Sequence, residues 1–362
     1  MGWIKKWLKQ KVGKRHILES LGKFLKRYDQ QNDVYRSQFF DEYQYSIANT
    51  RLVSSRGLLC NCDIAPHRPQ SSMVDKQYLA SIISALERVP DLSRPVSIYL
   101  CSEALSSFAK IVLPLIDRDF VLVSGDSDLP ISFQSLETSF HEITGHPRLH
   151  AWFAQNRVAD HPKLYSLPIG LDFHSRWNNP QIWGGGFVLP ALQETELRAI
   201  LSCSPSWQDR LPIAYCNWTA TLDRGDRAEC KTKADPRACY YLTAALSRTK
   251  TWQEQSNYAF VISPSGAGMD CHRTWEALAL GCVPIVKRHP YCDLFSLLPV
   301  IIVDDWSEVT AEFLMQQHRL LQNKSYDYSS LLLRSWQARI CGLGVQTPLS
   351  NIKFDAMRII FC

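Results

Sequence analysis

Apolar and polar residues form short blocks along this chain that predict strands separated by helices. In the first half, apolar runs at 96–101, 120–125 and 163–170 are short enough for strands, and 75–89 carries apolar residues at helical spacing. Short β-rich runs separated by helices are typical of a parallel sheet. We therefore predict an α/β fold for the first half.

The second half repeats this alternation more regularly. The pattern predicts strands at 211–218, 258–265, 283–288 and 300–305, and helices at 235–249, 270–281, 291–298, 307–324 and 328–344. Between the halves, 175–193 is rich in Asn, Pro and Gly, which indicates a linker. Two α/β halves predict a cleft between them, where ligands bind at the carboxyl ends of strands.

The amino-terminal residues 1–28 have a different pattern, with nine Lys or Arg and one Glu around apolar residues at helical spacing. This pattern predicts a basic amphipathic helix, which either lies on an anionic membrane surface or packs on its own domain. No secretory signal or membrane-spanning run is visible. We expect a cytoplasmic protein, peripheral on the membrane if the helix binds lipid.

Composition narrows the class of protein. The chain has 362 residues, of which 46% are hydrophobic and 21% charged, and a net charge of +5. These values indicate a globular protein of about two domains and argue against a nucleic-acid partner. The twelve cysteines lack metal-site spacing and predict mostly buried thiols in a reducing compartment. The predicted segments are a helix at 1–28, domains at 29–190 and 191–345, and a tail at 346–362.

The stretch 264–277, PSGAGMDCHRTWEA, carries the candidate chemistry. Gly266 and Gly268 permit a tight turn after a strand, and Asp270 is predicted to cap the following helix. A helix amino-terminus after glycines suits a phosphate or diphosphate. Arg273 can bind the diphosphate, and Glu276 can accept hydrogen bonds from ribose hydroxyls. The alternative is a structural turn with an Arg–Glu surface pair, because the third glycine of the dinucleotide fingerprint is missing.

A resemblance favours the ligand site. The run 258–286, YAFVISPSGAGMDCHRTWEALALGCVPIV, followed by LPVIIVDDW at 298–306, resembles the carboxy-terminal signature of exostosin-like glycosyltransferases. The resemblance implies a GT-B fold, with two Rossmann-like domains and the donor site in the second. It also implies inverting transfer of a sugar from a nucleotide diphosphate, most often UDP. The donor-binding residues it implies are Arg227, Ser263, Gly266, Gly268, Asp270, His272, Arg273 and Glu276.

The expected partners are therefore a UDP-sugar and a glycan or polysaccharide acceptor. Animal members of the family usually carry a membrane anchor and work in the Golgi lumen, whereas this chain shows only the basic helix, so a membrane-surface enzyme that builds a bacterial-type glycan fits better. The helix dipole and Arg273 can neutralise the leaving diphosphate, so no cofactor and no obligatory metal are expected. The first half carries little of the family's sequence, so the acceptor is not implied.

Inverting transfer also needs a general base, which should come from the first half. Asp126 and Asp128 come directly after the apolar run 120–125, and Asp126 is our first choice for the base. The alternative is that residues 125–128 only form a polar turn. Other candidates are His141, Glu142, and Asp172 with His174. Aromatic residues that would stack on sugar rings or fill a core are Trp152, Phe153, Trp177 and Trp183.

Three other functions remain open. Asp126 and Asp128 form a D-x-D pair after a strand, which in the GT-A fold holds Mn²⁺ or Mg²⁺ against the nucleotide sugar. That assignment would leave the glycine turn unexplained. The second alternative function is a non-catalytic glycan-binding module of the same fold. A nicotinamide-dependent oxidoreductase, resting on GAGMDC alone, is the third.

Overall fold

The computed structural model describes residues 39–90, 93–179, 186–218, 223–342 and 352–353. The predicted helix at 1–28, most of the predicted tail and Trp183 lie outside these residues. The chain divides into two compact units, Met1–Ser46 and Ile47–Cys362. The first is described only at 39–46, where most of helix α3 (Phe40–Ala48) lies, and the second contains both sheets. The domain boundary at 190/191 stays a prediction.

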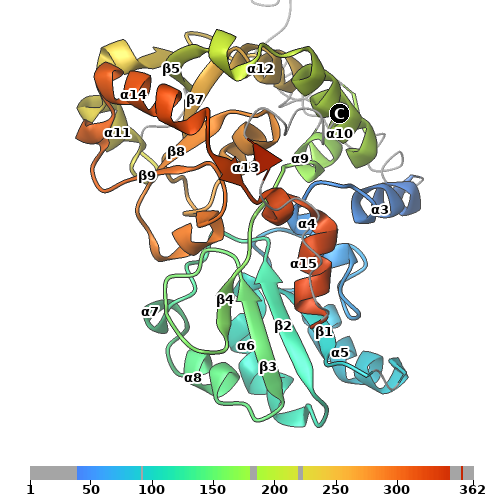
Figure 1. Cartoon of the computed structure of the whole chain (residues 1–362). Coiled ribbons are helices and arrows are strands. Elements are labelled where there is room, and N and C mark those ends of the chain that lie inside the picture. The colour runs from blue at the N-terminus through green and yellow to red at the C-terminus, as the bar shows by residue number, and fades with distance from the viewer. Residues whose placement is uncertain (1–38, 91–92, 180–185, 219–222, 343–351, 354–362) are drawn as a thin grey trace, which may run out of the picture. The chain divides into compact units, whose positions relative to one another are not determined.

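The first half of the large unit is built on a four-stranded parallel sheet in the order β1-β2-β3-β4 (Figure 1). Every residue of β2 is buried, as expected for a parallel strand covered on both faces. Strands are β1 (Val96–Cys101), β2 (Phe120–Gly125), β3 (Leu149–Ala154) and β4 (Leu164–Ser166). Helices are α4 (Ser55–Cys60), α5 (Lys76–Arg88), α6 (Leu105–Ile111), α7 (Phe133–Leu136), α8 (Thr138–Thr144) and α9 (His174–Asn178), with 3₁₀ turns Ser102–Ala104 and Leu113–Leu115.

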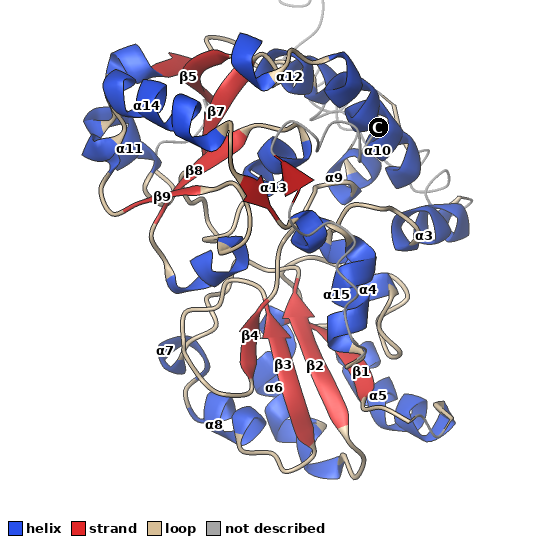
Figure 2. Cartoon of the chain, viewed as in Figure 1, coloured by secondary structure: helices blue, strands red, loops and turns tan. Residues whose placement is uncertain are grey.

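The second half has a five-stranded parallel sheet in the order β6-β5-β7-β8-β9. Figure 2 labels four of its strands, β5, β7, β8 and β9. Strands are β5 (Leu211–Cys216), β6 (Cys239–Tyr241), β7 (Tyr258–Ile262), β8 (Val283–Lys287) and β9 (Ile301–Val303). Helices are α10 (Pro190–Cys203), α11 (Arg227–Lys233), α12 (Arg248–Gln255), α13 (His272–Ala279), α14 (Ala311–Leu321) and α15 (Leu333–Ile340). Its 3₁₀ turns are Trp207–Asp209, Pro236–Ala238, Pro290–Phe295, Trp306–Glu308 and Tyr328–Leu331, and β10 (Ser325–Tyr326) pairs with β11 (Ile352–Lys353).

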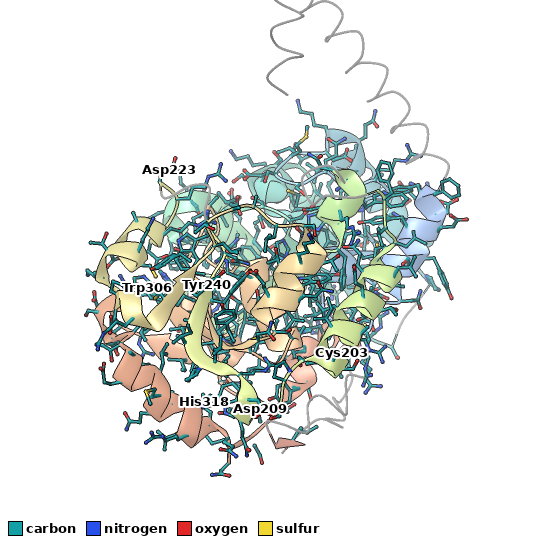
Figure 3. All side chains as sticks on the ribbon, turned by 90° about the horizontal axis from the view of Figure 1, so that it is seen from above. Cys203, Asp209, Asp223, Tyr240, Trp306 and His318 are labelled. Carbon is teal, nitrogen blue, oxygen red and sulfur yellow. The ribbon has the colours of Figure 1, made fainter. Side chains whose placement is uncertain are left out.

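Each sheet has its own hydrophobic core. The first gathers Phe108, Phe140 and Trp152 around its strands. The second contains Trp306, labelled in Figure 3, which is fully buried while its indole N–H donates to Asp226 at 2.8 Å. Two parallel sheets, each with a core of its own, confirm the predicted fold class of two Rossmann-like α/β halves.

The predicted helix at 235–249 is wrong. Residues Cys239–Tyr241 form the edge strand β6, which pairs in parallel with β5. Tyr240, labelled in Figure 3, stacks on Tyr215 of β5 with ring centroids 6.0 Å apart and on Tyr258 of β7 at 5.2 Å. Cross-strand aromatic pairs stabilise a sheet, and this tertiary contact outweighs the helical spacing read from the sequence. The helix begins later, at Arg248.

The end of the described chain returns to the first half. The backbone N–H of Val53 donates to Leu331 at 2.8 Å, and that of Leu333 donates to Arg51 at 3.0 Å. Helix α15, which the sequence assigns to the second domain, therefore packs beside α4.

Among the described residues, no helix is long and apolar enough to cross a membrane. The cysteines of the described ranges are free thiols, as predicted, but only Cys216, Cys230, Cys282 and Cys292 among them are buried. Their compartment stays a prediction.

A buried ion pair joins the two halves. Arg248, at the start of α12, places its guanidinium Nη2 2.8 Å from the carboxylate of Asp172, and both side chains are more than nine-tenths buried. The same guanidinium also donates to the backbone carbonyl of Asp172. Removal of one partner from such a pair leaves an uncompensated buried charge.

We therefore expect Arg248→Ala to lower the free energy of unfolding by about 3–5 kcal/mol, measured by urea denaturation. The matched control is Arg237→Ala, because Arg237 also pairs with an aspartate but its side chain is 69% exposed. The control should have little effect. Equal effects of the two substitutions would contradict the assigned role of Arg248.

Candidate functional site

The carboxyl ends of the two parallel sheets face each other, and the loops that follow their strands make the contacts. His272 Nδ1 lies 2.7 Å from the carbonyl oxygen of Gly170, in the loop after β4. Asp293, after β8, accepts a hydrogen bond from Ser166 at the end of β4 at 2.6 Å. Ligands of open α/β sheets bind outside the carboxyl ends of strands. The candidate site is therefore built where these loops meet.

The glycine turn, residues 263–271 after β7, is held by Asn156 from the first half. The side-chain oxygen of Asn156 accepts hydrogen bonds from the backbone N–H groups of Met269 and Asp270 at 3.0 and 3.1 Å. Its amide nitrogen donates to the carbonyl of Ser127 at 3.0 Å. Asn156 is 2% exposed. These two N–H groups are therefore occupied, and a phosphate at the turn must use other donors or displace Asn156.

The sequence predicted that Asp270 caps the following helix, and this prediction is wrong. Helix α13 begins at His272, with Cys271 at its N-cap position. The carboxylate of Asp270 turns inward, where it accepts the indole N–H of Trp275 at 2.9 Å and the backbone N–H of Ile169 at 2.8 Å. Burial raises its pKa to about 6. Asp270 thus connects the turn to the first half.

Both glycines of the turn permit close approach by charged side chains. A Cβ atom on Gly268 would lie 2.8 Å from Oδ1 of Asp128, and one on Gly266 would lie 3.0 Å from Nη2 of Arg227. Only the absence of a side chain lets these groups lie against the turn. The turn thus brings together a carboxylate of the first half and a cation of the second.

Two arginines concentrate positive charge beside the turn. Arg273 donates through Nε to Asn217 at 2.8 Å and through Nη1 to Ser263 at 3.3 Å, and it lies 5.6 Å from the centre of the Trp218 ring. Arg227 is the first residue of α11. Burial lowers its pKa, and the positive charge of Arg273 lowers it further. The two guanidinium groups are thus close enough for the charge of one to disfavour the charge of the other.

The remaining predicted donor residues lie on the same stretch. Glu276 is on α13, one turn after Arg273, and is 9% exposed. The hydroxyl of Ser263 is 2.9 Å from that of Thr274 in the first turn of α13. The eight predicted donor residues are thus gathered at one place, although only Arg227 comes from outside 263–276. Their contact with a donor stays a prediction.

The two predicted catalytic carboxylates have different surroundings. Asp126 is 7% exposed, lies 2.9 Å from Nη2 of Arg56 in an ion pair and accepts the hydroxyl of Ser71 at 2.8 Å. Asp128, two residues later, is exposed and lies against Gly268. A base must reach the acceptor hydroxyl. Of the two, Asp128 is therefore the better placed.

Backbone strain is concentrated at the carboxyl edge of the first sheet, around Asp126. The described non-glycine residues with positive φ are Ser72 (54°), Asp126 (58°), Glu137 (48°) and Asn156 (53°). Ser72 donates its N–H to the carbonyl of Asp126 at 2.9 Å, and Asn156 contacts the next residue, Ser127. Strained conformations persist where the surrounding structure holds them, and they cluster at functional sites. Three of the four strained positions therefore mark the carboxyl edge of the first sheet.

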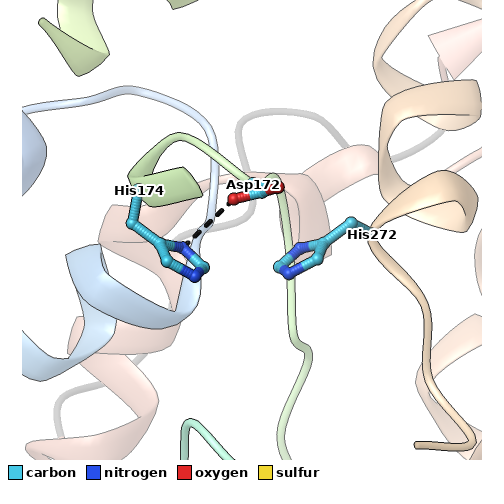
Figure 4. Close-up of side chains that lie close together, drawn as sticks. All are labelled: Asp172, His174 and His272. Carbon is cyan, nitrogen blue, oxygen red and sulfur yellow. Dashed lines mark ion pairs between the residues drawn. The ribbon is translucent and has the colours of Figure 1, made fainter. Parts of the chain in front are cut away.

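Asp172, His174 and His272 form a cluster whose ligand atoms lie within 4.8 Å of one another (Figure 4). These side chains are the candidate metal ligands among the residues described. His174 Nδ1 is 3.3 Å from Oδ1 of Asp172, but Oδ2 of that carboxylate is taken by Arg248, and Oδ1 also accepts the N–H of Ser175. The guanidinium charge beside Asp172 disfavours a second cation, so the residues fit a polar network better than a metal site.

Protonation states in this cluster follow from its burial and charges. Burial alone would raise the pKa of Asp172, yet His174, once protonated at low pH, and Arg248 hold that pKa well below its usual range. Burial lowers the pKa of His174 to about 4 despite Asp172. His174 is then neutral at pH 7, which leaves Arg248 as the permanent positive partner of Asp172.

The other residues singled out in the sequence lie elsewhere. His141 and Glu142 are on α8 and line a separate cavity with Lys110. Trp152 and Trp177 are buried, and Phe153 is 8% exposed, so these rings fill the interior instead of offering a surface to a sugar. Trp183 lies outside the described residues.

Sequence reasoning missed Arg56, Asn156 and Arg248. Asn156 follows β3 by two residues, so the rule that ligands bind at strand ends could have drawn attention to it. Arg56 and Arg248 lie in helices, at positions where no local pattern distinguishes them from surface cations.

Comparisons with known proteins identify no family. No protein-family model matches the chain, and a search of curated proteins finds no match. Among solved structures, the chain is similar to the "Crystal Structure of alpha1,3-Fucosyltransferase", with a TM-score of 0.33, 10% identity, and coverage of 78% of this chain and 93% of the other. These values are too low to assign a function. The exostosin-like resemblance therefore stays a prediction.

The lowered pKa of His174 predicts a pH effect on stability. The unfolded chain binds a proton at this histidine as the pH falls through 6.5, whereas the folded chain does so only near pH 4. Protonation therefore favours unfolding, and the shift accounts for a loss of about 3 kcal/mol between pH 7 and pH 4. Urea denaturation across this range should show a smaller loss in His174→Gln than in the parent. Parallel pH profiles would contradict this assignment.

Proposed function

We propose that this protein is a glycosyltransferase that transfers a sugar from a UDP-sugar to a glycan or polysaccharide acceptor with inversion. The observation that carries the proposal is the meeting, at the glycine turn, of Arg227 and Arg273 from the second half with Asp128 from the first. Paired cations suit a diphosphate, and a carboxylate opposite them suits a base.

In this proposal, the second half binds the UDP-sugar donor. Arg273 and Arg227 bind the diphosphate, assisted by the amino-terminus of α13. Glu276, one helical turn further, accepts hydrogen bonds from the ribose hydroxyls. This assignment rests on the proximity of the two arginines, on the position of Glu276 and on the resemblance of 258–286 to the exostosin-like signature.

The transfer itself needs one proton movement and one displacement. Asp128 accepts the proton of the acceptor hydroxyl while that oxygen attacks the anomeric carbon. The bond between this carbon and the diphosphate breaks, and UDP leaves with the bonding electrons. Arg273 and Arg227 stabilise the negative charge that develops on the diphosphate, so the proposed reaction requires no metal.

For the donor site, we expect Arg273→Ala and Glu276→Ala each to weaken UDP binding by about 2–3 kcal/mol, because each removes a charged hydrogen-bonding group. Isothermal titration calorimetry with UDP measures this. Arg288→Ala is the matched control, since Arg288 is an exposed arginine of the same half. If both site variants bound UDP like the parent, the assigned site would be wrong.

For the base, we expect Asp128→Asn to lower the rate of UDP release from a panel of UDP-sugars about 10²–10⁴-fold while UDP affinity is unchanged, because the amide cannot accept the proton. Asp160→Asn, which alters a fully exposed carboxylate, is the control. Parent activity should survive EDTA. Complete loss in EDTA that Mn²⁺ restores would instead support the metal-dependent alternative with Asp126 and Asp128.

A further inference from the structure

Two histidine side chains where the halves meet are not used by the reaction proposed above. His174 is the first residue of α9 in the first half, and His272 is the first residue of α13 in the second. Their rings point toward each other from opposite sides, with centroids 5.7 Å apart (Figure 4). Both residues are partly exposed. The pair is therefore accessible to a ligand.

The ring of His272 is held by the backbone of the first half. Its Nδ1 lies 2.7 Å from the carbonyl oxygen of Gly170, and because this oxygen can only accept, Nδ1 carries the hydrogen. The backbone at Gly170 is itself fixed: Leu171 donates its N–H to Val53 at 2.8 Å, and a Cβ on Gly170, whose φ is 65°, would collide with the carbonyl oxygen of Val53. The neutral imidazole therefore presents the lone pair of Nε2.

His174 has the same tautomer for a different reason. Its Nδ1 is 3.3 Å from Oδ1 of Asp172, a carboxylate that Arg248 and the N–H of Ser175 hold in place. Because a carboxylate oxygen repels a lone pair, the hydrogen of the neutral ring lies on Nδ1, and Nε2 is an acceptor. Among the described residues, neither His174 nor His272 has a hydrogen-bond partner at Nε2. Two acceptors on facing rings are thus left for a ligand.

Two lone pairs at a short spacing suit hydroxyl groups. Each hydroxyl offers one O–H donor, and neighbouring hydroxyls of a sugar ring place two such donors side by side. A phosphate or carboxylate that is ionised at neutral pH only accepts, so it finds no hydrogen on either Nε2 of the neutral rings. A divalent cation is disfavoured by the guanidinium of Arg248 beside Asp172. The pair therefore favours a sugar.

The position of the pair suits the sugar that is transferred. His272 immediately precedes Arg273 at the start of α13, where the proposed function binds the diphosphate. On the other side, the charge of Asp126 is close enough to affect the pKa of His174, so this ring lies beside the loop that carries Asp128. The part of the reactants that must lie between the leaving diphosphate and the base is the sugar whose anomeric carbon is attacked. The pair is thus placed to contact the hydroxyl groups of that sugar.

We propose that His174 and His272 bind two neighbouring hydroxyl groups of the transferred sugar through their Nε2 atoms, and so select which UDP-sugar the protein uses. This inference rests on the proposed glycosyltransferase function. It assigns the two histidines to the sugar and leaves the nucleotide to Arg227, Arg273 and Glu276. UDP alone therefore makes the nucleotide contacts but not the histidine contacts.

The test compares UDP with UDP-sugars, because only the UDP-sugars carry the hydroxyl groups in question. Isothermal titration calorimetry measures the binding of UDP, UDP-glucose, UDP-galactose, UDP-N-acetylglucosamine and UDP-xylose to the full chain. We expect the affinities of the parent for these UDP-sugars to differ at least tenfold, because hydroxyl positions are selected. His174→Asn and His272→Asn each keep an amide near the position of Nδ1 and remove Nε2. Each should weaken binding of the preferred UDP-sugar about tenfold and leave UDP binding unchanged.

Two further sets of variants separate the sugar contact from a structural effect. His174→Gln and His272→Gln, whose longer side chains return an acceptor near the position of Nε2, should recover part of the lost affinity. His150→Ala is the matched control, since it removes an exposed histidine on β3, and it should bind every ligand like the parent. Unchanged UDP binding also shows that the Asn variants are folded.

Three results would overturn the inference. The first is a parent that binds UDP but binds all the UDP-sugars with the same affinity. The second is UDP-sugar binding by the Asn variants that equals that of the parent and of His150→Ala. The third is an equal loss of UDP and UDP-sugar binding in the Asn variants. In each case the donor site of Arg227 and Arg273 stands. If the parent binds no UDP, the proposed function fails instead.

Discussion

The side chain of Asn156 is the contact on which the arrangement of the candidate site depends. Its oxygen accepts two backbone N–H groups of the glycine turn, and its nitrogen donates to the segment that carries Asp126 and Asp128. One buried amide therefore sets the position of the turn against that of the predicted catalytic carboxylates. Because buried polar groups are costly when unpaired, the loops of both halves must keep this geometry.

Buried charges reinforce this arrangement. Arg56 pairs with Asp126 on the first half, and Arg248 of the second half pairs with Asp172 of the first. Each pair satisfies a carboxylate that would otherwise be costly to bury. Arg227 and Arg273 differ, because they lie close enough to each other to repel. In the proposed function, these two guanidinium groups bind the diphosphate of the donor.

Much of the fold follows from local patterns. The apolar runs at 96–101, 120–125, 211–218 and 283–288 are strands because short buried runs between helices fit a parallel sheet. The prediction failed at 235–249, where aromatic stacking of Tyr240 on two neighbouring strands produces β6. It also failed at Asp270, which bonds to Trp275 and Ile169 instead of capping α13. Both errors arise from partners distant in sequence.

The sequence by itself determined the α/β class, the order of most strands and helices, and the glycine turn between β7 and α13, because each depends on residues that are neighbours in the chain. Only the tertiary structure decided that Asp128 lies against Gly268, that Arg227 reaches Gly266, and that Asp126 is paired with Arg56. These contacts join loops that follow different strands of two sheets. Side chains separated by many residues meet only once the sheets have formed and their carboxyl ends face each other.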